Sequence, residues 1–107
     1  AIVLSSPDPR ESAARFSRFL GRPVQKDGPG LRIPLDRGAL EFLPEEAATA
    51  LVGHAVDPGQ SCFVGLRIGL ADTAALPDDP RARWVDGSLV VPFDPTLGSG
   101  VWLFHPR

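Results

Sequence analysis

The two halves of this chain repeat one another. Three segments of the first half match three segments of the second half in the same order: residues 2–8 with 66–72, residues 31–36 with 89–94, and residues 38–44 with 100–106. Within the matched segments aspartate, glycine and proline fall in register. Self-similarity of this kind indicates a duplicated supersecondary unit, so we expect both halves to fold alike.

The first half opens with a strand near residues 2–6, followed by a helix predicted over residues 9–20. Asp8 is a suitable N-cap, Pro9 a suitable first helical residue, and Gly21 a suitable end. Apolar residues recur along this segment at helical spacing. We therefore expect one face of the helix to be buried against the sheet, including Phe16, Phe19 and Leu20.

Alternating apolar residues and turn signals predict the remaining elements. The first half continues with strands near residues 24–26, 31–36 and 39–43, the last two forming a hairpin. The second half follows the same order, with a strand over 62–70, a short helix over 73–76, and strands near 83–85, 89–93 and 101–105. Between the halves, residues 45–51 have some helical character, but the glycines and proline that follow favour a connecting segment.

These elements predict a single α+β domain spanning residues 1–107. It would consist of two βαβββ modules, about residues 1–44 and about residues 62–107, joined by a linker over residues 45–61.

Composition argues against several functional classes. The net charge is −2 and the arginines are spread along the chain, which is not the footprint of a nucleic-acid-binding protein. No apolar run reaches membrane-spanning length and the first residues do not resemble a signal peptide, so we expect a cytoplasmic protein. Cys62 is the only cysteine, which permits neither an internal disulfide nor a cysteine-based zinc cluster. A start directly on a strand, without any methionine, is what a piece of a longer chain would show.

The doubled βαβββ order resembles the vicinal oxygen chelate superfamily, which includes glyoxalases, bleomycin-resistance proteins and dioxygenases. The residues that carry the resemblance are Ile2-Val3-Leu4-Ser5-Ser6-Pro7-Asp8 leading into a helix, Phe19-Leu20-Gly21, Ala39-Leu40-Glu41-Phe42, and Phe93-Asp94-Pro95 followed by Val101-Trp102-Leu103. Together they cover essentially the whole chain. The resemblance implies that the two modules curl into a cup-shaped mixed sheet with helices on the convex side.

Metal-binding members of this superfamily usually take ligands from the first and last strands of each module. The first-strand positions fall here at Ala1 and Gly65, and the last-strand positions fall at Glu41 and at Leu103 or Trp102. Only Glu41 is a metal donor, whereas a catalytic metal needs three or four converging nitrogen or oxygen atoms. The resemblance is therefore to members without a metal, and we expect no cofactor.

Strand alternation predicts which residues face the cup. Odd-numbered residues of the first strand share a face with Glu41, and the matching face of the second module carries Arg67. Because Arg67 is the only charge within residues 62–70, Glu41 is its natural partner. The pair can anchor an anion or a carbonyl group, or it can be a purely structural ion pair, or Arg67 can extend to the rim. The candidate ligand-binding residues are Glu41, Arg67, Ser5, Phe63 and His105.

Three functions remain open from the sequence. The first is a metal-free glyoxalase-like domain that binds a small, partly apolar molecule in its cup, with no nucleic-acid or membrane partner. The second is a lyase or another enzyme of the superfamily that acts on a small oxygenated substrate. The third is a scaffold whose sheet face forms a homodimer.

Overall fold

The computed structural model describes residues 1–53, 59, 62–71, 76–94, 96 and 99–106. The elements within these residues are, in order, β1 (Ile2–Ser6), α1 (Pro9–Leu20), β2 (Gln25–Asp27), β3 (Gly30–Pro34), β4 (Ala39–Pro44), α2 (Glu45–Val52), β5 (Cys62–Leu70), β6 (Arg83–Val85), β7 (Ser88–Pro92) and β8 (Val101–Pro106). The short helix predicted over residues 73–76 lies outside the described residues, apart from its last position. No helix in the described part of the chain is long and apolar enough to cross a membrane.

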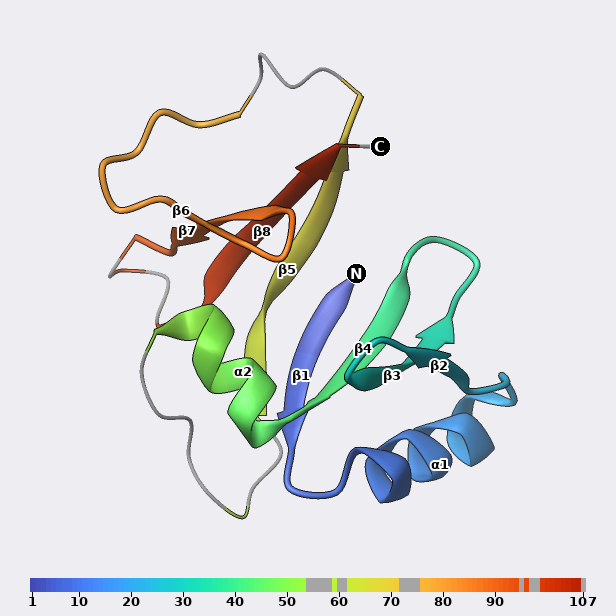
Figure 1. Ribbon diagram of the computed structural model, residues 1–107. Coiled ribbons are helices and arrows are strands. Elements are labelled where there is room, and N and C mark those ends of the chain that lie inside the picture. Colours follow the sequence, from blue (N-terminus) through green and yellow to red (C-terminus); the bar gives the residue numbers. More distant parts are fainter. Residues whose placement is uncertain (54–58, 60–61, 72–75, 95, 97–98, 107) are drawn as a thin grey trace.

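The eight strands form one mixed sheet in the order β2-β3-β4-β1-β5-β8-β7-β6. β1 and β5 pair antiparallel at the centre, and each has a parallel partner on its outer side, β4 or β8. Read outwards from the centre, both halves therefore have the same strand arrangement. Figure 1 shows the sheet curled into a half-barrel, with the β2–β3 and β6–β7 hairpins at its two ends. The predicted α+β fold class is confirmed.

Strand pairing in the two halves follows the sequence repeat. Leu31 lies opposite Phe42 in the first half, and Leu89 lies opposite Phe104 in the second. These are the residues that the repeat equates with each other. The two hairpins therefore share one register. A chance likeness between short strands would not explain this agreement, which supports a true internal repeat. The bounds of the two modules remain a prediction.

Helix α1 begins and ends where the sequence predicts. The Asp8 carboxylate accepts a hydrogen bond from the backbone N–H of Glu11 at 3.2 Å, which satisfies one of the free donors of the first turn. Gly21 adopts a left-handed conformation with φ of 68°, and its N–H donates to the carbonyl of Ser17. Glycine adopts this conformation without steric cost, which explains the end of the helix there.

The face that α1 buries differs from the prediction. Ala13 is fully buried, whereas Phe19 is 88% exposed and Phe16 and Leu20 are 36% and 39% exposed. Successive residues turn by about 100° in an α-helix, so Phe19 lies about 120° around the helix from Ala13. Phe16 keeps one contact with the sheet, where its ring centroid lies 5.4 Å from that of Phe42. All three residues are exposed, so the expected burial is wrong for each of them.

Helix α2 covers residues 45–52, where the sequence has some helical character but the following glycines and proline favoured a connecting segment. That these residues link two modules remains a prediction. Tertiary contacts support this short helix. Ala48 and Leu51 are buried, and Arg83 of β6 donates hydrogen bonds to the carbonyls of Ala50 and Leu51. A positive charge is favourable at the C-terminal end of a helix, where the last carbonyls lack partners.

The two helices pack on opposite faces of the sheet. α1 covers a cluster that includes Ile33 and Phe42, whereas α2 covers a cluster that includes Val3, Leu43 and Leu103. Neighbours in one strand thus belong to different clusters, as the alternation of side chains requires. α2 contacts β4 in one half and β7 in the other, so the sheet curls around this helix. We refer to the α2 side as the concave face and to the α1 side as the convex face.

Candidate functional site

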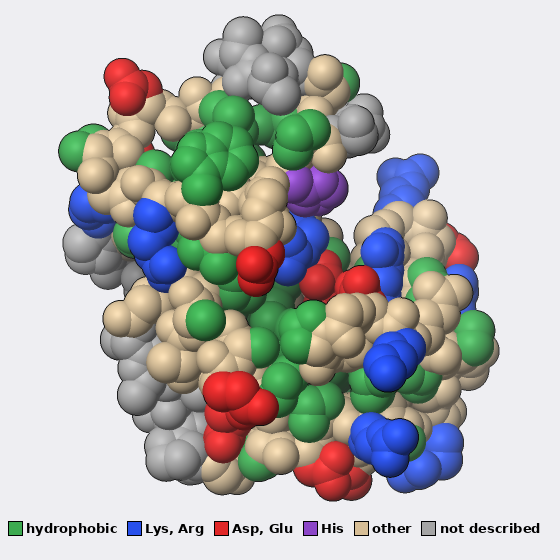
Figure 2. All heavy atoms as spheres, viewed as in Figure 1, with side chains coloured by type: hydrophobic (Ala, Val, Ile, Leu, Met, Phe, Trp, Pro, Cys, Tyr) green, Lys and Arg blue, Asp and Glu red, His purple; other side chains and the backbone are tan. Residues whose placement is uncertain are grey.

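A pocket of about 490 Å³ lies on the concave face beside α2. Strands β3, β4, β5, β7 and β8 supply its floor, α2 supplies one wall, and the turns of the β2–β3 and β6–β7 hairpins form its rim. Figure 2 shows a hollow in the surface where basic, acidic and histidine side chains meet. The wall is apolar and includes Leu43, Ala47, Leu51 and Val85.

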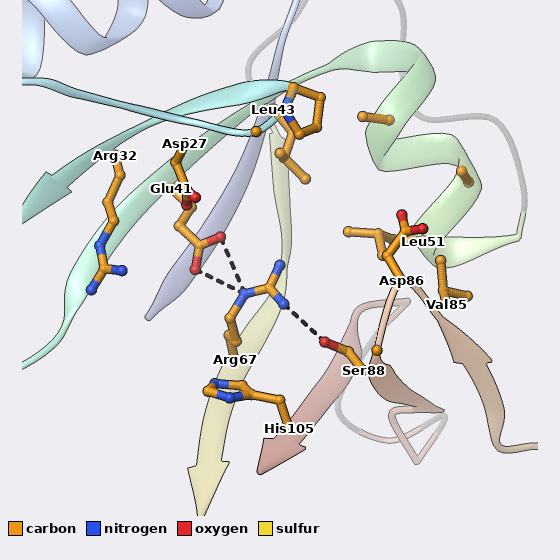
Figure 3. Close-up of a pocket in the computed structure, with 15 residues that line it drawn as sticks. Asp27, Arg32, Glu41, Leu43, Leu51, Arg67, Val85, Asp86, Ser88 and His105 are labelled. Atoms are coloured by element: carbon orange, nitrogen blue, oxygen red, sulfur yellow. Dashed lines mark hydrogen bonds and ion pairs between the residues drawn. The ribbon is translucent and has the colours of Figure 1, made fainter. Parts of the chain in front are cut away.

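Glu41 and Arg67 form an ion pair on the floor of this pocket (Figure 3). The Nε–H of Arg67 donates to both carboxylate oxygens of Glu41, at 3.1 and 2.9 Å, and an Nη1–H donates to Ser88 Oγ at 3.1 Å. The Glu41 side chain is only 7% exposed, while that of Arg67 is 26% exposed. The structure therefore brings together the two charges that strand alternation predicts, and it adds Ser88 as a third member. Ligand binding by these residues stays a prediction.

Sheet register explains why the two charges meet. Glu41 on β4 pairs with Val3 on β1, and Val3 pairs with Gly65 on β5. Arg67 lies two residues after Gly65, so its side chain is on the same face of β5. Gly65 packs so closely on β8 that a Cβ atom there would lie 2.1 Å from the carbonyl oxygen of Val101. Glycine at this position therefore lets β5 and β8 approach closely beneath the pocket.

Arg32 is a pocket residue that the sequence reasoning missed. It lies on β3 directly opposite Glu41 and lines the pocket, where Figure 3 shows it on the side away from α2. Its Nε atom is shielded from solvent and has no hydrogen-bond partner among the described residues. The signal was present in the predicted hairpin, because its register places Arg32 on the same face as Glu41.

Two other predicted site residues have different placements. His105 on β8 lines the pocket, and its Nδ1 lies 3.0 Å from the carbonyl oxygen of Pro106. Ser5 is fully buried on the concave face of β1, but it is not among the described residues that line the pocket. Its Oγ has no hydrogen-bond partner within the described part of the chain.

The prediction that Phe63 faces the cup is wrong. The β1–β5 pairing is irregular after Val3, since Gly65 lies opposite Val3 but Phe63 lies opposite Leu4, which leaves Val64 as an extra residue. A bulge of this kind reverses the side-chain alternation along the strand. The Phe63 ring consequently lies on the convex face, where its centroid is 6.1 Å from that of Phe93.

The residues at the superfamily's metal positions do not fit a metal. Among the described residues there is no group of three or more histidine, cysteine or acidic side chains placed to hold an ion. The close approach of Gly65 to Val101 leaves no space for a ligand side chain at position 65, and Leu103 is fully buried among apolar residues. Glu41 is already paired with Arg67. We therefore derive no chemistry through a metal.

Two carboxylates outside the pocket have shifted pKa values. The pKa of Asp79 is lowered because its carboxylate accepts hydrogen bonds from the backbone N–H of Arg81, at 2.8 Å, and from the Arg81 guanidinium. The pKa of Asp94 is lowered in the same way by the backbone N–H of Thr96 at 3.0 Å and by its hydroxyl at 2.9 Å. Hydrogen bonds to the charged form favour ionisation, which explains both directions.

Comparison with known proteins gives a distant likeness in fold. No protein-family model matches this chain, and no curated protein sequence matches it. A hypothetical protein from S. aureus has a similar structure, with a TM-score of 0.43 and 11% sequence identity over 98% of this chain and 90% of that chain. A glyoxalase/bleomycin resistance protein/dioxygenase from Nocardioides also has a TM-score of 0.43, with 13% identity over 95% of this chain and 78% of that chain. These values do not establish a family, so membership in the vicinal oxygen chelate superfamily remains a prediction.

Proposed function

We propose that this domain binds a small, partly apolar molecule in the pocket on its concave face. The observation that carries the proposal is the composition of that pocket. Its floor holds the Arg67–Glu41 ion pair with Ser88, and its wall consists of apolar side chains from α2 and neighbouring strands. Ligand sites in proteins commonly combine an apolar lining with a few polar groups that fix orientation.

The size of the pocket supports a small molecule. Its volume of about 490 Å³ lies within the range of about 300–1,000 Å³ that is usual for ligand sites. The floor is preorganised, because Arg67 is held on two sides by Glu41 and Ser88. A side chain fixed in this way loses little conformational entropy when a ligand binds.

An enzymatic function of the same pocket is the second candidate. His105 lines the pocket on the same floor as Arg67, and histidine is the side chain best suited to proton transfer near neutral pH. Under this alternative, His105→Asn would abolish turnover of a small oxygenated substrate and leave binding intact. Loss of binding in that variant would instead support a role for His105 in holding the ligand.

The binding proposal can be tested with the fluorescent apolar anion 8-anilinonaphthalene-1-sulfonate. Ala50 of α2 lines the pocket and is exposed, so Ala50→Phe should fill the pocket without disturbing the core. Glu46 is an exposed residue of the same helix that is not among the lining residues, and Glu46→Phe is the matched control. We expect saturable binding that weakens by about 10-fold or more in Ala50→Phe, equivalent to about 1.4 kcal/mol, and is unchanged in Glu46→Phe. Equal binding to all three proteins would contradict the proposal.

A further inference from the structure

Arg32 carries a hydrogen-bond donor that is shielded from solvent and has no acceptor in the described part of the chain. Its Nε has no partner among the described residues, although the side chain lines the pocket. Burying a donor without an acceptor lowers stability, so an unsatisfied buried donor in a native protein calls for an explanation. The side chain of Arg32 lines the pocket, and its guanidinium makes no ion pair with any described residue, so an anionic ligand in the pocket would be a suitable partner for it.

The carboxylate that lies opposite Arg32 in the sheet is already engaged. Arg32 lies opposite Glu41, but both carboxylate oxygens of Glu41 accept from the Nε–H of Arg67, at 3.1 and 2.9 Å. The floor of the pocket therefore holds two guanidinium groups and one carboxylate. Asp27 and Asp86 also line the pocket, but Arg32 makes no ion pair with them or with any other described residue.

We propose that the ligand of this pocket is a small monocarboxylate whose carboxylate binds to Arg32. This inference rests on the proposed function and names the chemical class of its ligand. A guanidinium presents its donors in a rigid planar fork that matches the two oxygens of a carboxylate. The ligand carboxylate pairs with the guanidinium of Arg32, which makes no ion pair with a described residue.

The apolar wall of the pocket accounts for the rest of the ligand. Figure 3 shows Arg32 and Leu51 on opposite sides of the pocket, and Val85 lies on the same side as Leu51. Ala47 and Ala50 of α2 extend this apolar side. A molecule with its carboxylate at Arg32 therefore places its apolar body against α2.

The rim of the pocket restricts the charge of the ligand. Asp27 at the end of β2 and Asp86 in the β6–β7 turn line the pocket, and both are exposed to solvent. Their negative charges repel anions that approach the mouth, and the repulsion grows with the charge of the anion. A single carboxylate therefore suits this pocket better than a phosphate group, which carries up to two negative charges at neutral pH.

The test compares 4-phenylbutyrate with its neutral amide by titration calorimetry. We expect the native protein to bind the acid about 10- to 100-fold more tightly than the amide, as is typical when a charge-assisted hydrogen bond is lost. Arg32→Met should remove this preference while leaving the affinity for the amide unchanged. Arg10→Met, which removes an exposed arginine of α1, is the matched control and should behave like the native protein. An excess of inorganic phosphate should not displace the acid.

Folding of the variant is checked separately. Because the Arg32 Nε makes no hydrogen bond to a described residue, Arg32→Met should unfold at a urea concentration no lower than that of the native protein. Arg32→Lys keeps the charge but loses the fork, and should retain a weakened preference for the acid. Equal affinity for acid and amide, an intact preference in Arg32→Met, or displacement by phosphate would each overturn the carboxylate assignment. A separate result tests the proposed pocket itself, which would be contradicted if Ala50→Phe left the binding of the fluorescent anion unchanged.

Discussion

Replacing Arg67 by methionine separates the structural contribution of the floor pair from its role in binding. The substitution keeps most of the side-chain volume but leaves the carboxylate of Glu41, 7% exposed, without its partner. Breaking a buried ion pair from one side typically costs about 3–5 kcal/mol. Because Arg67 is 26% exposed, we expect the free energy of unfolding to fall by a smaller amount, about 2–3 kcal/mol.

The sequence repeat supplies the compensating change. The counterparts of Glu41 and Arg67 in the other half are Leu103 and Val3, which are both buried and apolar. Glu41→Leu combined with Arg67→Met should therefore restore most of the stability. A residual loss of about 1 kcal/mol remains, because the hydroxyl of Ser88 loses its partner. Arg67→Met should also abolish binding of the fluorescent anion, because it removes a polar group of the floor, and the double variant should not recover this binding.

Urea unfolding followed by tryptophan fluorescence measures these differences. With a slope of about 2 kcal/mol per molar urea, the single variant should shift the midpoint by about 1–1.5 M. Arg32 lies opposite Glu41 and can take over as its partner, so the series is repeated in the Arg32→Met background. Two results would refute a stabilising Glu41–Arg67 pair. One is a loss of unfolding free energy below about 0.5 kcal/mol for Arg67→Met in both the native and the Arg32→Met background, and the other is a double variant that is less stable than Arg67→Met.

Three further predictions concern stability. Phe42→Ala should lower the free energy of unfolding by about 3–5 kcal/mol, because Phe42 is 1% exposed. Phe19→Ala should change it by less than about 0.5 kcal/mol, because Phe19 is 88% exposed; urea titrations measure both values. Gly65→Ala should fail to accumulate as folded protein or show a strongly lowered urea midpoint, because its Cβ would overlap a backbone carbonyl oxygen. Because the pKa values of Asp79 and Asp94 are lowered, their ionised carboxylates stabilise the fold at any pH above the usual value of 3.8. This stabilisation is lost as the pH falls through the lowered pKa values. Thermal unfolding scans of a variant with both residues changed to asparagine should lack this part of the acid dependence.

The sequence was informative wherever regular alternation and the repeat held. The repeat predicts one strand arrangement used twice, and the structure has Leu31 opposite Phe42 and Leu89 opposite Phe104. Side-chain alternation alone places Glu41 and Arg67 on one face of the sheet. This works because the pairing of β4 with β1 and of β5 with β8 is regular around these two residues.

Predictions failed where local irregularity or tertiary contacts decide the structure. The extra residue Val64 reverses the alternation of β5, so Phe63 faces away from the cup. α2 has no side-chain cap at its start, and its formation depends on contacts from distant residues such as Arg83. Sequence periodicity showed an apolar face on α1 but not its exact direction, so Phe19 was wrongly expected to be buried.

Proton–nitrogen correlation NMR during a titration with 4-phenylbutyrate can show where this protein holds a ligand. We predict that the amide signals of Glu41, Leu51 and Ser88 shift together with the side-chain Nε–H signal of Arg32, all with one saturation curve. Signals of α1 on the convex face should not move. Shifts centred on the exposed Phe19, or no saturable shift at the pocket residues, would contradict a ligand site on the concave face.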